Sequence, residues 1–451
     1  MTSDRIKCPP NACPTYPLTV CPQKIVARSL QCRSFGPKWP GGAGVHLKRL
    51  RRLRLSTFSA YRPTLFYKAF LKSVGKLFPP AVRDSQPFDD WSQIETVTQT
   101  NYPFEATADL PGVSFIAMRQ MILMQVKSNG LTVLQDEEQH LTVETAHGLI
   151  GLRSGRETET AGFVGAVDEH WLFVMKGAVV SQMSHVMPEV AAKMRWSNGS
   201  EEGALPPNFA FVEVRDVREL GPNFYRVTFK GEDLSQHGDA AIHFRLVLPA
   251  EGSAPRWPSV AANGSVVWPD GPDAPHRPVY TTRSVDCDTN TLIMDVYIHE
   301  GGRVTEWARR QLNKPAARRV VGLLGPSGGG LLQADQVLMA TDETGLPAAA
   351  RLLENLPGDV TGDLLLESEN GAACAYPIAA PPGIKMTWLS RASGESLRDA
   401  TLARLPSHVA SKIWFAGERE DARSIRDAAK AAGREAADLR ISGFWRAPDA
   451  K

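Results

Sequence analysis

The feature that most constrains the fold of this chain is a change of hydrophobic period in its second half. Between residues 209 and 299, short runs of β-branched and apolar residues are separated by clusters of Gly, Pro, Asn and Asp. From residue 336 onward, apolar runs of strand length alternate with stretches that have helical spacing. The first pattern predicts an antiparallel sheet or barrel, and the second predicts a parallel sheet with helices on its faces.

The individual elements follow from the same patterns. We predict antiparallel strands at 209–217, 225–230, 243–248, 279–286 and 292–299. A helix over 304–312 and a strand over 319–324 come next. The parallel sheet is predicted from strands at 337–340, 364–367, 386–389 and 412–416 and from helices at 347–355, 396–404 and 419–432.

A smaller α+β module is predicted upstream, over residues 100–197. Alternating runs at 131–134, 141–144 and 149–152 indicate strands. A helix is predicted from Leu172 to Met187, where apolar residues recur at spacings of three and four, and more helix is expected beyond Pro188. Met183, His185 and Met187 are interpreted as packing and surface residues of this helix, not as metal ligands.

The leader, residues 1–95, differs from the rest in composition. The net charge of the 451 residues is only +2, yet residues 1–83 contain sixteen Lys or Arg and one acid, Asp4. Three interpretations remain open: an Arg-rich targeting peptide, a basic amphipathic surface for membrane or RNA, or a start codon placed too far upstream. We predict a disordered leader and base no function on it.

Composition also limits the compartment and the partners. The body that follows the leader is acidic, which argues against nucleic acid as a partner. No apolar run is long enough for a membrane span, so stable membrane insertion is not expected. The six cysteines form no paired framework, and the early four (Cys8, Cys13, Cys21 and Cys32) lack the C-x2-C spacing of a metal site. We expect a cytoplasmic protein, a monomer, with domains at 1–95, 100–197, 207–330 and 331–451.

Two motifs in the predicted barrel carry groups suited to a flavin. The run Arg277-Pro-Val-Tyr-Thr-Thr-Arg283 places guanidinium, phenol and hydroxyl groups along one extended stretch. Arginine pairs with phosphate, an aromatic ring packs along the isoalloxazine, and threonine can donate to its N5 atom. The run His299-Glu-Gly-Gly-Arg-Val-Thr-Glu-Trp307 is a glycine-rich turn that enters a helix, where free amides can hold a pyrophosphate. An ordinary helix N-terminus explains the second motif equally well.

With further motifs in the same order, the chain resembles the siderophore-interacting family of FAD-dependent ferric reductases, relatives of ferredoxin reductase. Those motifs are Gly325-Pro-Ser-Gly-Gly-Gly330, Asp342-Glu-Thr-Gly-Leu-Pro-Ala348, Trp414-Phe-Ala-Gly-Glu418 and Gly443-Phe-Trp-Arg446. The resemblance spans residues 209–446. It implies a multidomain α+β and α/β fold: a ferredoxin-reductase-like antiparallel β-barrel FAD domain and a parallel-sheet NAD(P)-binding domain. The module in front resembles a small domain that some family members carry.

The resemblance also implies roles for individual residues. Those expected to bind FAD or the nicotinamide nucleotide are Arg277, Tyr280, Thr281, Arg283, His299, Gly302, Val304, Thr305, Trp307, Asp342, Thr344, Gly345, Arg391, Gly417 and Glu418. Arg391 is the expected reader of a 2′-phosphate, although an arginine exposed at a strand end explains it nearly as well. Arg245 and Arg446 are expected to contact the substrate, since basic groups attract an anionic ferric siderophore.

The chain departs from the family pattern at several positions. Arg277 stands three residues before the tyrosine where two is usual, and Ser327 occupies a position where arginine is frequent. Gly345 replaces alanine, and Arg245 occupies a position where lysine is frequent. These changes leave the role of Arg277 open and suggest a different preference among ferric chelates.

The implied activity is transfer of electrons from NADPH or NADH through FAD to a ferric siderophore, with release of Fe(II) for iron acquisition. No catalytic triad, metal ligands or Walker loop is expected, because the cofactor carries the redox chemistry. Two alternatives remain. One is a flavin reductase that serves a protein or free-flavin acceptor, and the other is a siderophore-binding protein without enzymatic activity.

Overall fold

The computed structural model describes residues 102–154, 160–199, 201–312 and 320–447, all of which belong to one compact unit of the chain. The leader and its four cysteines lie outside the described residues, so their interpretation stays a prediction. None of the described helices is long and apolar enough to cross a membrane. Within the described ranges, no group of three or more His, Cys, Asp or Glu side chains is arranged to hold a metal ion.

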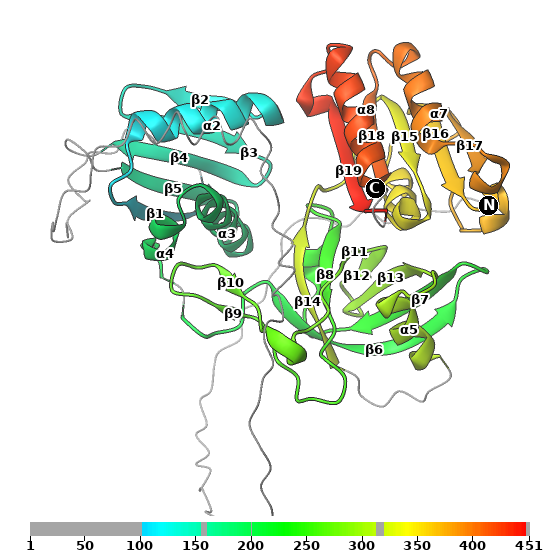
Figure 1. Cartoon of the computed structure of the whole chain (residues 1–451), viewed down its shortest axis with the longest axis horizontal. Coiled ribbons are helices and arrows are strands. Elements are labelled where there is room, and N and C mark those ends of the chain that lie inside the picture. Colours follow the sequence, from blue (N-terminus) through cyan, green and yellow to red (C-terminus); the bar gives the residue numbers. More distant parts are fainter. Residues whose placement is uncertain (1–101, 155–159, 200, 313–319, 448–451) are drawn as a thin grey trace, which may run out of the picture. The chain divides into compact units, whose positions relative to one another are not determined.

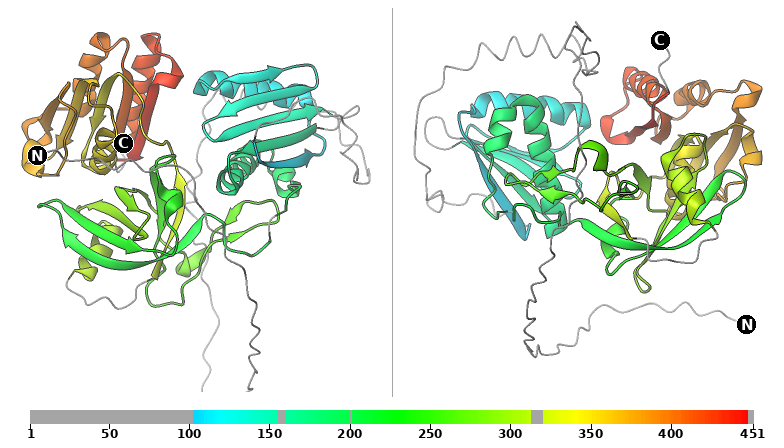
Figure 2. Two further views of the ribbon diagram at one scale, coloured as in Figure 1. Left: turned by 180° about the vertical axis from the view of Figure 1, so that it is seen from behind. Right: turned by 60° about the horizontal axis from the view of Figure 1, so that its bottom comes forward.

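The N-terminal module is a five-stranded antiparallel sheet in the order β1-β5-β4-β3-β2, with helices packed against it (Figure 1). The view from behind in Figure 2 shows the strands in front of α2. Its strands are β1 (Phe104–Leu110), β2 (Val133–Asp136), β3 (His140–Thr145), β4 (Gly148–Ser154) and β5 (Thr160–Ala166). Its helices are α2 (Phe115–Asn129), α3 (Glu169–Val186) and α4 (Pro188–Lys193).

The sequence missed three elements of this module, β1, α2 and β5. Every residue of β5 is buried, so its sequence lacks the alternation that marks a half-exposed strand. Helix α2 carries apolar residues on several sides, which weakens its helical period. Its ends are nevertheless defined locally, because the Ser114 hydroxyl accepts from the amide of Ala117 and Gly130 adopts the left-handed conformation with φ 65°.

The second region is an antiparallel sheet of seven strands in the order β11-β8-β14-β6-β7-β13-β12. The strands are β6 (Phe209–Glu219), β7 (Phe224–Lys230), β8 (His243–Val247), β11 (Val279–Thr281), β12 (Ser284–Asp286), β13 (Thr291–Tyr297) and β14 (Val320–Ser327). A short hairpin, β9 (Ser259–Val260) and β10 (Val266–Val267), extends from it. Helix α5 (Arg303–Gln311) buries Val304 and Ala308 in the core of this sheet.

The two edge strands of the seven-stranded sheet are joined by two residues, Thr282 and Arg283. The sheet must therefore curl until its edges meet, as in a barrel. At this junction the Thr282 amide donates to Ile242 O beside β8, and the Arg283 amide donates to Ile293 O on β13, both at 2.8 Å. The single strand predicted over 279–286 was thus wrong, because the chain crosses here from one edge of the sheet to the other.

The third region is a parallel sheet in the order β17-β16-β15-β18-β19. Its strands are β15 (Gln336–Thr341), β16 (Thr361–Ser368), β17 (Ile384–Ser390), β18 (Lys412–Glu418) and β19 (Leu439–Trp445). Helix α6 (Leu346–Glu354) packs on one face, and α7 (Leu397–Arg404) and α8 (Arg419–Ala431) pack on the other. The sequence predicted every one of these elements except β19.

Together these elements confirm the predicted fold class. An antiparallel barrel precedes a parallel sheet with helices on both faces, and an α+β module comes first. The cores are distinct: one belongs to the module, one to the barrel, and the parallel sheet has one on each face. The parallel strands read as continuous apolar runs because both of their faces are covered.

Candidate active site

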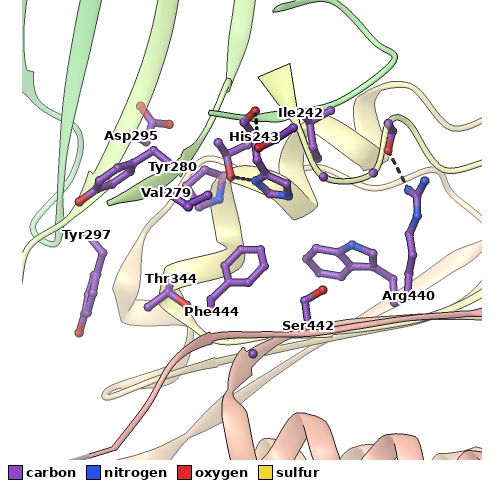
Figure 3. Close-up of a pocket in the computed structure, with 18 of the residues that line it drawn as sticks. Ile242, His243, Val279, Tyr280, Asp295, Tyr297, Thr344, Arg440, Ser442 and Phe444 are labelled. Carbon is purple, nitrogen blue, oxygen red and sulfur yellow. Dashed lines mark hydrogen bonds between the residues drawn. The ribbon is translucent and has the colours of Figure 1, made fainter. Parts of the chain in front are cut away.

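A pocket of about 480 Å³ receives residues from the barrel and from the parallel sheet (Figure 3). Its volume lies in the range of about 300–1,000 Å³ that is usual for small-molecule sites. The barrel and its following loop contribute Ile242, His243, Val279, Tyr280, Thr281, Asp295, Tyr297, His299 and Ser327 to Gly330. The parallel-sheet region contributes Thr344, Pro347, Trp414, Arg440, Ser442, Gly443 and Phe444.

Tyr280 and Thr281 line this pocket on strand β11, next to the barrel junction. The Thr281 hydroxyl lies 3.4 Å from Nδ1 of His243 on the neighbouring strand β8. Burial lowers the pKa of His243 to about 4, so its ring is neutral at physiological pH. Burial likewise raises the pKa of the Tyr280 phenol. This wall therefore offers neutral hydrogen-bonding groups and an aromatic ring.

The N-terminus of helix α5 has the features expected of an anion site. Its N-cap residue is Gly302, which has no side chain to bond the first free amides of the helix. A Cβ atom at Gly302 would lie 2.7 Å from the His299 ring and 2.8 Å from Thr305 Oγ1, so only glycine fits without a shift. The first amides of α5 therefore have no side-chain cap, and the His299 ring packs against Gly302 and lines the pocket.

The other predicted residues of this helix serve its packing. The Thr305 hydroxyl is buried, donates to Tyr297 O at 3.2 Å and lies 3.4 Å from the amide of His299. Val304 is buried in the barrel core, and Trp307 packs against that core. These contacts hold the turn in place, and none of the three side chains lines the pocket.

Arg283, expected near the flavin phosphate, lies at the junction of the barrel with helix α6. Its two terminal nitrogens bond the Glu354 carboxylate, one of them at 2.7 Å, while its buried Nε has no hydrogen-bond partner. Arg351 on the same helix donates to Thr282 O at 2.6 Å. The two arginines therefore tie helix α6 to the strand junction that carries Tyr280 and Thr281.

A second polar connection is made by Asp295, which also lines the pocket. Asp295 on β13 is buried and accepts from Nε and Nη2 of Arg226 on β7, both at 2.8 Å. It also accepts from the Tyr376 hydroxyl at 2.7 Å. Tyr376 follows β16 in the parallel-sheet region, so this carboxylate joins the two regions. Its charge is balanced by the guanidinium of Arg226.

Asp342 follows the carboxyl end of β15, where nucleotides bind in parallel sheets. It accepts from the Thr344 amide at 2.9 Å, from the Thr344 hydroxyl and from Nε1 of Trp445 at 2.6 Å. Burial raises the pKa of Asp342 to about 6 despite these donors. Thr344 lines the pocket, whereas Asp342 supports it from behind.

The remaining residues expected at this edge have structural contacts. Gly345 is buried, and a Cβ atom there would lie 2.0 Å from Thr341 Oγ1, which explains glycine where alanine is usual. A Cβ atom at Gly417 would lie 3.1 Å from Asp342 Oδ2. Glu418 accepts from the amides of Glu420 and Asp421 and thereby caps helix α8.

Arg391 lies among three carboxylates at the carboxyl ends of neighbouring strands. Its Nη1 bonds Glu343 and Glu367, each at 2.9 Å, and its Nε lies 3.6 Å from Glu369. Glu343 is almost completely buried, with a side chain 3% exposed. The residue expected to read a 2′-phosphate is therefore already engaged by acidic groups.

The three other predicted basic residues lie outside the pocket lining. Arg245 donates to Arg277 O at 3.3 Å, and the Arg277 guanidinium stacks 4.6 Å from the Trp268 ring centroid. Arg245 lies on β8 opposite Val279 of β11, and Arg277 stands two residues before β11 begins. Arg446 is exposed directly after β19.

Sequence reasoning missed strand β19, and with it one wall of the pocket. Arg440, Ser442 and Phe444 stand at alternate positions of this strand and line the pocket, whereas Ile441 between them is buried on the opposite face with α8. Figure 3 shows Ser442 and Phe444 facing His243 and Tyr280 across the pocket. The alternation over Arg440 to Phe444 was the available signal, but short polar strands rarely stand out.

The residues present fit a flavin nucleotide. The pocket combines the Tyr280 and Phe444 rings with neutral donors from Thr281 and His243, and His299 continues the lining toward the uncapped amides at Gly302. Glycine at 302 lets the His299 ring and the Thr305 hydroxyl pack closely against the turn, because a Cβ atom there would lie within 2.8 Å of both. An aromatic site with a nearby anion-binding helix end suits a ring system that carries a pyrophosphate.

Comparison with known families agrees with this geometry. A model described as the siderophore-interacting FAD-binding domain matches residues 213–329, and one described as siderophore-interacting protein matches residues 334–448. A protein named ferric vibriobactin reductase from Vibrio cholerae is 30% identical over 201 residues, covering 42% of this chain and 68% of that protein. The chain therefore belongs to the siderophore-interacting protein family, and its barrel is an FAD-binding domain of that family.

Individual relatives are similar over the same part of the chain. The NADPH-dependent ferric-chelate reductase of Escherichia coli K12 is 28% identical over 249 residues, which cover 53% of this chain and 93% of the relative. The crystal structure of a siderophore utilization protein from T. fusca is 28% identical, with a TM-score of 0.43 over 55% of this chain and 97% of that one.

Proposed function

We propose that this protein reduces ferric siderophores, using FAD and electrons from NADPH or NADH. The observation that carries the proposal is the pocket itself, which brings the Tyr280–Thr281 wall of an FAD-binding domain against Phe444 and Thr344 of the parallel-sheet region. Relatives named ferric-chelate reductase and ferric vibriobactin reductase support the same reaction. Bound FAD would supply the chemistry, by taking a hydride from the nicotinamide and giving single electrons to Fe(III).

The side chains have separate tasks in this proposal. Tyr280 holds the ring plane of the flavin from the barrel side, and Thr281 with His243 offers hydrogen bonds to the polar edge of the ring. The amides that follow Gly302 hold the pyrophosphate. The nicotinamide nucleotide approaches the carboxyl ends of β15 and β18, where Thr344 faces the pocket.

Because the donor is a cytoplasmic nucleotide, we propose that the reaction takes place in the cytoplasm with a ferric siderophore as acceptor. The purified chain tests the proposal. Its absorbance spectrum should show bound flavin after incubation with FAD, anaerobic NADPH or NADH should bleach it, and a ferric siderophore with a ferrous trap should restore it. A monomer is expected from size-exclusion chromatography.

Each alternative activity predicts a different result. In one, the bound flavin bleaches with a nicotinamide and is reoxidised only by a protein or by free flavin. In that case the protein or the free flavin is the acceptor, and the siderophore is not. A protein that takes up no FAD yet binds a siderophore would be a binding protein. Either result would overturn the proposed reaction.

A further inference from the structure

The pocket contains a cationic end that no role above explains. Arg440 lies on β19 at the fifth position before Trp445 and lines the pocket with Ser442. Figure 3 shows Arg440 and Tyr297 at opposite ends of the pocket. The two ends therefore meet different parts of whatever molecules occupy the pocket.

The backbone beside Arg440 is shaped to receive its guanidinium. Nη1 of Arg440 donates to Gly330 O at 2.8 Å. A Cβ atom at Gly329 would lie 3.0 Å from Cζ of Arg440, so the guanidinium packs on a residue that has no side chain. The guanidinium is thus positioned by the Gly328–Gly330 run and is not a mobile surface group.

Its charge is not balanced within the described part of the chain, where no carboxylate forms an ion pair with it. The contacts of its guanidinium there are to the carbonyls of Gly330 and Leu331. Burial lowers the pKa of Arg440 without an opposing carboxylate. In contrast, Asp295 in the same lining is balanced by Arg226. The pocket therefore carries an uncompensated positive charge at its Arg440 end, where an anion would be attracted.

The position of Arg440 along β19 argues for the acceptor as the source of that anion. A nucleotide binds at the carboxyl ends of parallel strands. Arg440 pairs with Trp414, which lies near the start of β18. On its own strand, β19, Arg440 stands four residues before Phe444. Because β19 ends at Trp445, five residues after Arg440, a rise of about 3.3 Å per residue places Arg440 about 16 Å from the carboxyl end of the strand.

We propose that Arg440, with the Ser442 hydroxyl, binds a negatively charged oxygen ligand of the ferric chelate and favours anionic over neutral chelates. This inference rests on the proposed reduction of ferric siderophores and adds a preference for substrate charge. Arginine suits the task because its planar donors pair with two oxygens at once.

The test compares Arg440→Gln and Arg440→Lys with the wild-type protein, using FAD-loaded full-length chain. The matched control is Arg423→Gln, which removes the same charge from an exposed position on α8. Binding is measured with gallium(III) chelates, which are not reduced, by quenching of tryptophan fluorescence. One chelate is a tricatecholate, which is anionic, and the other is a neutral trihydroxamate.

We expect Arg440→Gln to weaken binding of the tricatecholate about tenfold, the cost of one charge-assisted contact, with less than about twofold change for the trihydroxamate. Arg440→Lys should restore part of the affinity, and the control should not change it. Equal weakening of both chelates would show that Arg440 only supports Gly330. Unchanged binding, or no binding of the anionic chelate by the wild type, would also overturn the proposal.

Stopped-flow measurement of flavin bleaching by NADPH and by NADH separates the remaining possibilities. Unchanged bleaching in Arg440→Gln is expected. Slower bleaching with a higher KM for the nucleotide would show that Arg440 binds an anionic group of the nucleotide and not of the chelate, which would overturn the proposal. If the wild type binds the gallium tricatecholate through Arg440 but does not reduce the iron chelate, the proposed reaction fails while the binding inference stands.

Discussion

Nε1 of Trp445, on the last strand that the structure describes, donates to Oδ2 of the buried Asp342 at 2.6 Å. This bond joins the C-terminal motif to the loop after β15, although the two residues are far apart in sequence. It fixes the end of β19, and with it the position of Phe444 in the pocket. Two motifs noted separately in the sequence therefore act as one structural unit.

Asp342→Asn should change how the stability of the protein depends on pH. The pKa of Asp342 in the folded state is raised to about 6. The protonated carboxyl therefore contributes to the free energy of unfolding in full below the pKa of the unfolded state, and this contribution is lost as the pH rises through 6. A shift of this size corresponds to about 3 kcal/mol. The free energy of unfolding of Asp342→Asn minus that of the wild type should therefore be higher at pH 8 than at pH 4.5. Chemical unfolding at both pH values measures this difference. An identical difference at both pH values would contradict the raised pKa.

Gly302→Ala should weaken FAD binding about tenfold, because the new methyl group meets His299 and Thr305 at the turn that holds the pyrophosphate. Equilibrium dialysis with FAD measures the effect. Gly177→Ala on α3 is the control, since nothing lies within 4 Å of a Cβ atom there. If Gly302→Ala bound FAD as the wild type does, the pyrophosphate would lie elsewhere.

Tyr280→Ala should also raise the dissociation constant of FAD about tenfold, since the ring supplies stacking area in the pocket. Tyr280→Phe keeps the ring and should change it less than about threefold. The pair of variants separates stacking from hydrogen bonding by the phenol. If Tyr280→Phe lost more affinity for FAD than Tyr280→Ala, stacking of the Tyr280 ring would not be the main contribution to binding.

Arg391→Gln should lower the free energy of unfolding by about 2 kcal/mol, because the buried carboxylate of Glu343 loses its cationic partner. We expect kcat/KM for NADPH and NADH to fall by the same factor, since Glu343 and Glu367 already occupy the guanidinium. Arg398→Gln, an exposed arginine on α7, is the control. A loss of kcat/KM with NADPH but not with NADH would support the expected contact of Arg391 with the 2′-phosphate.

The fold class was predictable because it depends on local features of the sequence: the spacing of apolar residues and the glycine and proline residues that end each element. Most strands and helices from β6 to α8 followed from alternation, from apolar runs and from glycine and proline between them; the short β9–β10 hairpin and the division of β11 from β12 did not. Tyr280, Thr281, His299 and Thr344 could be named from their motifs, and the structure places all four in one pocket. Whether they contact FAD or the nucleotide stays a prediction.

Tertiary structure alone decided the rest, because pairing across the chain has no local signature. Closure of the barrel broke the run from Val279 to Asp286 into two edge strands. Pairing of β19 with β18 brought Arg440 and Phe444 into the pocket, and the carboxylates of three strand ends engaged Arg391. The sequence by itself determined which residue types were available and in which elements, and the folded chain decided which of them share a site.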